Sequence, residues 1–183
     1  MKISAHNDHF TRFPYRAEER KGERNNGGID LLTNPEQIDL IHELAESPQL
    51  YDLVLELNRP GRPLMTLGCA YGEDDGFFCG YLDLSIRDLP VAQNELFIAS
   101  IDDQFRDWLN VTFNGNDPAL GIYHSFFWEY SKFTYFDTEP RYLISIFFRA
   151  QKQEDCEAIL SWLHKFFRVA LEPTIQRLVE TAL

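Results

Sequence analysis

The chain has 183 residues and a formal net charge of −12, and 44% of its residues are hydrophobic and 25% are charged. These values exclude a wholly disordered chain and suit one soluble domain over residues 1–183, in which we expect residues 1–30 to be the less ordered part. No apolar run approaches the roughly 20 residues of a membrane-spanning helix, and the N-terminus lacks the apolar centre of a secretory signal. We therefore expect a cytoplasmic protein without membrane contact.

The negative charge is concentrated in the middle of the chain. Residues 31–120 hold 4 Lys or Arg and 16 Asp or Glu, whereas residues 1–30 hold 6 and 5, and residues 121–183 hold 7 and 8. A negative field repels phosphate groups, which argues against a nucleic-acid partner. The same field attracts a basic protein and speeds its association. Acidity that serves solubility alone is the general alternative.

The stretch TNPEQIDLIHELAES predicts a helix over residues 35–46. Asn34 can cap this helix, and Pro35 suits its first position. Ser47 and Pro48 are predicted to end it. The buried stripe would consist of Ile38, Ile41, Leu44 and Ala45.

Residues 51–58, YDLVLELN, alternate apolar and polar side chains and predict a half-buried strand. The Pro60-Gly61 pair that follows predicts a type II turn. A second strand then places four apolar side chains on one face, namely Met65, Leu67, Cys69 and Tyr71.

The stretch CAYGEDDGFFCG, residues 69–80, could be a disulfide-clamped finger, a metal loop or a hairpin turn. Apolar side chains occupy odd-numbered positions before this stretch and even-numbered positions from residue 78 to residue 86. Residues that pair across a hairpin lie on the same face of the sheet, so each odd-numbered residue must pair with an even-numbered one, and their numbers must add up to an odd number. A pair between Cys69 and Cys79 breaks this rule, which excludes the disulfide. A four-residue turn over residues 73–76 and a two-residue turn at Asp75-Gly76 both satisfy it.

The second half of the chain predicts two strands and a long helix. Residues 89–113 admit two interpretations. They form either a strand over NELFIAS followed by a short helix capped by Asp102, or one longer helix. The next stretch, FNGNDPALG, is predicted to be a loop. FFWEYSKFTYF and RYLISIFFR predict strands, and residues 152–171 predict an amphipathic helix that ends or kinks at Pro173. The predicted fold is α+β, with an antiparallel meander of about five or six strands packed on a long C-terminal helix.

The sequence contains no recognisable catalytic or metal-binding motif. The stretch HNDH, residues 6–9, has no matching ligands downstream, and Glu73-Asp74-Asp75 lacks the ligand spacing of a calcium loop. His124-Ser125 lacks a third group that would orient the base. Glycine-rich phosphate loops are absent. We therefore expect a protein that is not an enzyme and that uses no cofactor and no metal ion.

In its size, its acidity, its α+β layout and its hairpin TLGCAYGEDDGFFCGYLDL, the chain resembles the small immunity proteins that bacteria keep beside secreted toxins. This resemblance is one of general character. It implies a non-catalytic inhibitor that covers the active site of a basic toxin, such as a nuclease or a deaminase. The contact residues would then be the acids of the hairpin and of residues 102–107, namely Glu73, Asp74, Asp75, Asp102, Asp103 and Asp107.

A curved antiparallel sheet that grips a long helix also resembles the helix-grip folds that hold small apolar ligands. The aromatic residues of 126–148 would then line a cavity of a few hundred Å³. A cavity of that size would support this alternative, whereas a filled core would argue against it.

Overall fold

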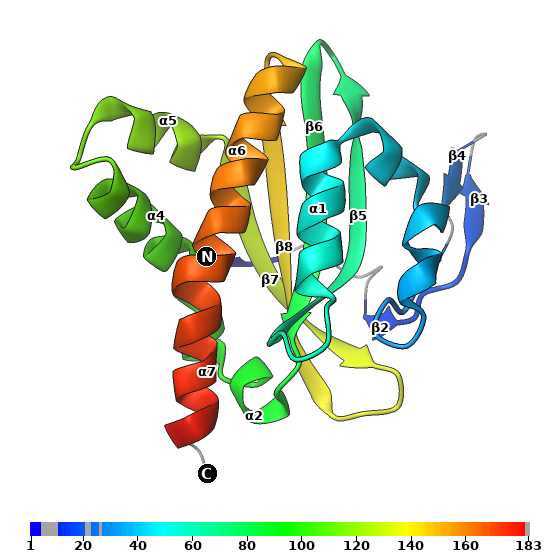
Figure 1. The fold of residues 1–183 in the computed structure, drawn as a ribbon. Helices are drawn as coiled ribbons and strands as arrows, with labels where there is room; N and C mark the ends of the chain where they lie inside the picture. Colours follow the sequence, from blue (N-terminus) through cyan, green and yellow to red (C-terminus); the bar gives the residue numbers. More distant parts are fainter. Residues whose placement is uncertain (5–10, 21–22, 26, 182–183) are drawn as a thin grey trace.

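The computed structural model describes residues 1–4, 11–20, 23–25 and 27–181, and its centre is a six-stranded sheet with the strand order β1-β7-β8-β6-β5 (Figure 1). Two short N-terminal strands run parallel to β7 and pair with its outer edge. The strands of this sheet are β1 (Lys2–Ile3), β2 (Arg12–Phe13), β5 (Leu64–Asp74), β6 (Phe77–Ile86), β7 (Phe126–Tyr135) and β8 (Pro140–Ala150). A separate pair consists of β3 (Glu18–Arg20) and β4 (Glu23–Asn25).

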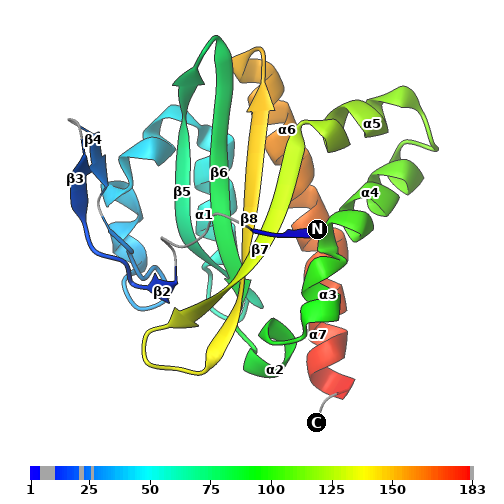
Figure 2. The same ribbon diagram turned by 180° about the vertical axis from the view of Figure 1, so that it is seen from behind.

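Helices cover one face of the sheet, and no described helix covers the other face, which we call the open face (Figure 2). The covering layer contains α1 (Pro48–Leu57) and α6 (Gln153–Phe166). A π-helical turn, η3 (Phe167–Leu171), carries α6 into α7 (Glu172–Thr181), so that the C-terminal helix spans 29 residues and passes Pro173 without ending. The predicted α+β fold, a mostly antiparallel sheet on a long C-terminal helix, is confirmed.

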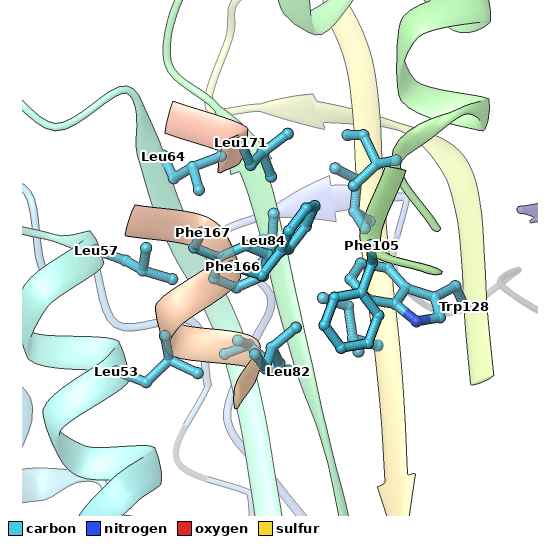
Figure 3. Close-up of a cluster of buried hydrophobic side chains, with 14 of the residues drawn as sticks. Leu53, Leu57, Leu64, Leu82, Leu84, Phe105, Trp128, Phe166, Phe167 and Leu171 are labelled. Atoms are coloured by element: carbon cyan, nitrogen blue, oxygen red, sulfur yellow. The ribbon is translucent and has the colours of Figure 1, made fainter. Parts of the chain in front are cut away.

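The core lies between the sheet and these helices, and its side chains fill that space (Figure 3). The ring of Phe105 lies 5.1 Å from the ring of Phe166 and 5.6 Å from that of Trp128, and all three are buried. One face of β8 and the apolar side of the predicted C-terminal helix both lie in this core. Its buried members include Tyr142, Ile144, Ile146, Phe148, Cys156, Ile159, Leu160, Leu163 and Phe167.

Residues 48–57 form helix α1, so the prediction of a strand over residues 51–58 is wrong. The Ser47 side chain accepts a hydrogen bond from the Leu50 N–H, and Pro48 lies in the first turn, so these two residues begin a helix instead of ending one. Helical spacing explains the burial pattern better than two-residue alternation does, since the buried residues are Leu50, Leu53, Val54 and Leu57.

The segment before α1 folds as two short 3-10 helices, η1 (Pro35–Leu40) and η2 (His42–Glu46), and not as one α-helix. Ile41 between them has an extended backbone, and Asn34 makes no side-chain cap. Ile38 and Leu44 are buried while Ala45 is exposed. Positions 38, 41 and 44 are three residues apart, which is the period of a 3-10 helix.

Both tight turns predicted from the sequence are present. The Arg62 N–H donates to the carbonyl of Arg59, and Gly61 has a φ of +80°, as a type II turn requires. In the acidic hairpin, Asp74 pairs with Phe77, so the two-residue Asp75-Gly76 turn is the register that forms. Both turn residues have positive φ, which defines a type I′ turn.

A β-bulge interrupts β5 at Leu67, because Thr66 pairs with Leu84 and Gly68 pairs with Asp83. Alternation does not continue through a bulge, so the prediction of one shared apolar face on this strand is wrong. The side chains of Cys69 and Tyr71 pack on the helix-facing core, whereas Met65 and Leu67 belong to a second cluster on the opposite face. Cys69 and Cys79 are both free, which confirms the exclusion of a disulfide between them.

Helices replace the strand and much of the loop that were predicted between β6 and β7. They are α2 (Leu89–Ala92), α3 (Glu95–Ala99), α4 (Ile101–Thr112) and α5 (Asp117–His124). Asn94 caps α3 by accepting a hydrogen bond from the Phe97 N–H, which turns NELFIAS into a helix. Asp102 is not the cap of α4, because it lies inside the first turn and Ser100 precedes the helix.

We expect Phe105→Ala to lower the free energy of unfolding by about 3–5 kcal/mol, because it empties the centre of the core. Urea denaturation measures this loss. The control is Val111→Ala on the same helix, where the side chain is 79% exposed and the expected change is within about 0.5 kcal/mol. Equal losses in the two variants would contradict this account of the core.

Candidate functional site

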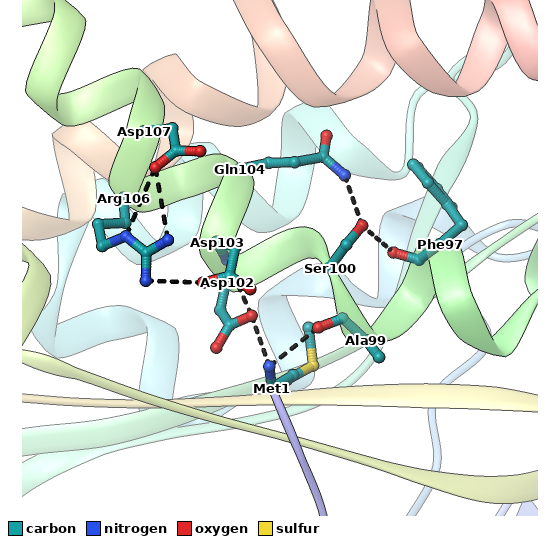
Figure 4. A network of polar contacts seen from close by, with 9 residues as sticks. All are labelled: Met1, Phe97, Ala99, Ser100, Asp102, Asp103, Gln104, Arg106 and Asp107. Atoms are coloured by element: carbon teal, nitrogen blue, oxygen red, sulfur yellow. Dashed lines mark hydrogen bonds and ion pairs between the residues drawn. The ribbon is translucent and has the colours of Figure 1, made fainter.

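Internal contacts occupy the three acidic residues that the sequence predicts as contact residues on α4 (Figure 4). The Met1 ammonium group donates to Asp102 Oδ1 at 2.6 Å and to the carbonyl of Ala99 at 2.9 Å. Arg106 lies 2.7 Å from a carboxylate oxygen of Asp103 and 3.5 Å from one of Asp107. Part of the negative charge of α4 is therefore balanced within the molecule.

The three acids of the hairpin lie on a different part of the surface. Glu73, Asp74 and Asp75 are exposed at the tip of β5 and β6, and both views of the fold show this tip far from α4 (Figures 1 and 2). No ion pair joins them to another described residue. The six predicted contact residues therefore form two separate groups, and the tip is the group that remains unneutralised.

A row of three aromatic side chains crosses the open face of the sheet near this tip. Tyr81 on β6 pairs with Phe147 on β8, which pairs with Phe127 on β7. The ring centroids of Tyr81 and Phe147 are 6.2 Å apart, and those of Phe127 and Phe147 are 6.1 Å apart. Phe127 and Phe147 are nevertheless 48% and 40% exposed. We call these three side chains the aromatic row.

A hollow of about 770 Å³ lies over the aromatic row and the upper part of β5. Ala70 and Gly72 have little or no side chain there, which leaves space beside the larger rings. The hollow is wide open, and its polar rim comes from β5, β6, β8 and the end of α5. Its lining includes Glu73, Asp74, Cys79, His124, Ser125 and Arg149.

The polar groups at the rim do not form a catalytic pair. The Ser125 hydroxyl donates to the carbonyl of Gly121 at 3.0 Å, which is a contact within the end of α5. His124 is exposed, and no carboxylate of the described residues lies within ion-pair distance of it. The guanidinium of Arg149 lies over the ring of Phe77, 5.1 Å from its centroid. The rim thus offers charge and hydrogen bonds for binding.

Asp83 lies one row below the aromatic row and is almost fully buried on the open face of the sheet. Ser145 Oγ donates to its carboxylate at 2.5 Å. Burial raises the pKa of Asp83 to about 7, and the hydrogen bond from Ser145 opposes this rise. The Tyr15 hydroxyl and a carboxylate oxygen of Asp83 both lie close to Gly68, so the N-terminal segment covers this side of the carboxyl.

The aromatic row is not among the sites predicted from the sequence, although Tyr81 falls on the odd-numbered side of its strand, opposite to the apolar positions 78 to 86. The signal was present in the alternation of FFWEYSKFTYF and RYLISIFFR, where Phe127 and Phe147 fall on the side opposite to the buried positions. Three other aromatic side chains of the sheet are buried in the core and do not belong to this row. They are Tyr71, Trp128 and Tyr130.

Neither a metal site nor a membrane span is evident in the part of the chain that the structure describes. No three His, Cys, Asp or Glu side chains there come together as ligands, and the HNDH stretch at residues 6–9 lies outside the described residues. Within the same ranges, no helix has the length and apolar character needed to cross a bilayer. No protein-family model, curated protein or solved structure matches the chain.

We expect Asp102→Ala to lower the free energy of unfolding by about 1–3 kcal/mol, because it leaves the buried Met1 ammonium without its carboxylate. Thermal or urea denaturation checks this value. Asp103→Ala removes a more exposed carboxylate from the same helix and is expected to cost less than about 1 kcal/mol. A larger loss in the Asp103 variant would overturn this assignment of roles.

A second prediction concerns the pH dependence of stability. The pKa of Asp83 is higher in the folded state than in the unfolded chain, so the unfolded state loses its proton first and stability falls as pH rises from about 4 to about 7. Asp83→Asn should remove a loss on the order of 2–3 kcal/mol between pH 5 and pH 8. Ser145→Ala retains the carboxyl and should retain the loss. Identical pH profiles for the wild type and Asp83→Asn, measured by urea denaturation, would refute the assignment.

Proposed function

We propose that this chain is a non-catalytic protein-binding module that holds a basic partner protein on the open face of its sheet. The observation that carries the proposal is the aromatic row. Two of its three rings are 40% or more exposed although the chain has a well-filled core elsewhere. Aromatic side chains are enriched in the centres of protein interfaces, where they contribute much of the binding energy.

The acidic hairpin tip supports the choice of a basic partner. Glu73 and Asp74 lie on the rim of the hollow, beside the aromatic row, and Asp75 lies in the adjoining turn. Rim charges act mainly by steering a partner of opposite charge and by raising its rate of association. The acids of α4 have internal partners and lie elsewhere, so we assign them no contact with this partner.

A finer proposal follows from the general resemblance to immunity proteins. The partner would be a basic toxin domain, such as a nuclease or a deaminase, and binding would cover its active site. The acidic tip supports this proposal through its charge, because active sites that bind nucleic acid are basic. A small apolar ligand is the alternative occupant. It is favoured by the volume of the hollow, which falls within the usual range of about 300–1,000 Å³.

The test is affinity capture from the source cell, identification of the retained protein, and titration of that purified protein by calorimetry. Phe127→Ser combined with Phe147→Ser is expected to weaken binding by at least about tenfold, because each change removes a large apolar contact. Replacing Glu73, Asp74 and Asp75 with Lys should slow association and reduce its dependence on salt.

Two matched controls locate the effect. Leu96→Ser combined with Val111→Ser removes two other exposed apolar side chains and should leave binding unchanged. Asp103→Lys combined with Asp107→Lys alters acids on α4 and should likewise leave it unchanged. A captured partner that is not basic, or equal binding by the aromatic variant and the wild type, would refute the proposal. A retained small molecule in place of a protein would establish the ligand alternative.

A further inference from the structure

The two edges of the main sheet differ in how they are covered. Along the outer edge of β7, the N-terminal segment adds β1 next to Glu129 and Tyr130, and β2 next to Thr134 and Tyr135. At the opposite edge, β5 ends the strand order, and no described strand pairs with its outer side. An uncovered edge strand presents unpaired backbone groups to any extended chain that approaches it.

The lower part of this edge is partly shielded, whereas the upper part is not. Helix η2 packs beside β5, and a small pocket of about 40 Å³ at this place is lined by Ile41, Glu43 and Thr66 to Cys69. Residues 70–74 follow the last residue of this pocket, and both views show the end of β5 rising past η2 to the hairpin tip (Figures 1 and 2). The open length is therefore about five residues, which is a common strand length.

The register identifies the backbone groups that point outward on this open length. In a two-residue hairpin the residues flanking the turn, Asp74 and Phe77, exchange both hydrogen bonds, and the pattern then alternates along the strand. The N–H and C=O groups of Tyr71 and Glu73 consequently point away from β6. No backbone hydrogen bond outside the helices and strands reaches either residue within the described ranges.

The same edge borders the hollow on the open face. The side chains of β5 on that face are small, with Gly68, Ala70 and Gly72 in successive positions, and Tyr81 stands beside Ala70 on the neighbouring strand. A strand added along β5 would project every second side chain over Ala70 and Gly72, toward Tyr81. Its other side chains would lie on the side of Glu73, next to an exposed carboxylate.

We propose that an extended segment of the basic partner adds to the sheet as a strand beside residues 70–74 of β5, with alternating apolar and basic side chains. This inference rests on the proposed function and specifies how the partner is held. Backbone hydrogen bonds to Tyr71 and Glu73 provide the attachment, while apolar side chains enter the hollow and Lys or Arg side chains meet Glu73. Strand addition of this kind gains affinity from the main chain and selectivity from alternate side chains.

The probe is a blocked peptide of four Val-Lys repeats, titrated into the isotope-labelled protein and followed by NMR and amide hydrogen exchange. We expect the Tyr71 and Glu73 amides to shift and to exchange at least about tenfold more slowly in the complex. Glu73→Pro removes one outward N–H at an edge position that tolerates proline, and it should abolish binding. Glu73→Gln retains the N–H and removes the charge, so it should weaken binding only severalfold.

Each other outcome overturns the inference. Equal binding of a Val-Glu peptide would show that charge does not select the occupant, and equal binding by Glu73→Pro would show that the edge is not used. A dimer of the free protein that Glu73→Pro dissociates, seen by analytical ultracentrifugation, would make a second copy the occupant. Loss of partner capture on mutation of the aromatic row, with no effect of Glu73→Pro, would retain the proposed function and reject strand addition.

Discussion

The packing of aromatic rings between the sheet and its helices is the interaction on which the rest of the structure depends. Phe105 from α4 contacts Phe166 from α6 and also Phe126 and Trp128 from β7, with ring centroids 5.1–5.6 Å apart. This contact joins three elements that are distant in sequence. It also fills the space between the sheet and its helices that a helix-grip ligand would need.

The N-terminal segment divides that opposite face into two halves with different properties. In the lower half, Phe13 stacks on Tyr135 and buries Met65, Leu67, Phe133 and Leu143 in a second cluster. In the upper half, the second cluster does not reach the aromatic row, and Phe127 and Phe147 are exposed. Asp83 lies at the boundary, where burial disfavours its charged form. The division therefore separates a part of the face that serves stability from a part available for binding.

Local signals predicted much of the fold, and long-range contacts account for most of the errors. The strands β6, β7 and β8 and the C-terminal helix were predictable because their patterns extend over ten or more residues. The α1 segment was misassigned because leucines at positions 53, 55 and 57 satisfy a strand pattern, while the decisive evidence was the cap at Ser47. The bulge at Leu67 left no clear sequence signal, because it depends on pairing with β6. The internal roles of Asp102 and Asp103 depend on Met1 and Arg106, and the sequence does not indicate the contact with Met1.

The bulge at Leu67 also determines how this protein can change in length. It lets one strand serve two cores, with Leu64 and Thr66 on the helix side below it and Cys69 and Tyr71 on the same side above it. Leu67 is the extra residue of this bulge, so its deletion would leave Thr66 opposite Leu84 and Gly68 opposite Asp83, with every other side chain on its present face. Thr66 would keep both of its hydrogen bonds with Asn58, at the end of α1, and the loss would be that of the buried Leu67 side chain from the second cluster. Leu67 is therefore the position in β5 where the chain can shorten by one residue without a change of face, whereas elsewhere length variation belongs to exposed loops such as Asn114–Asn116.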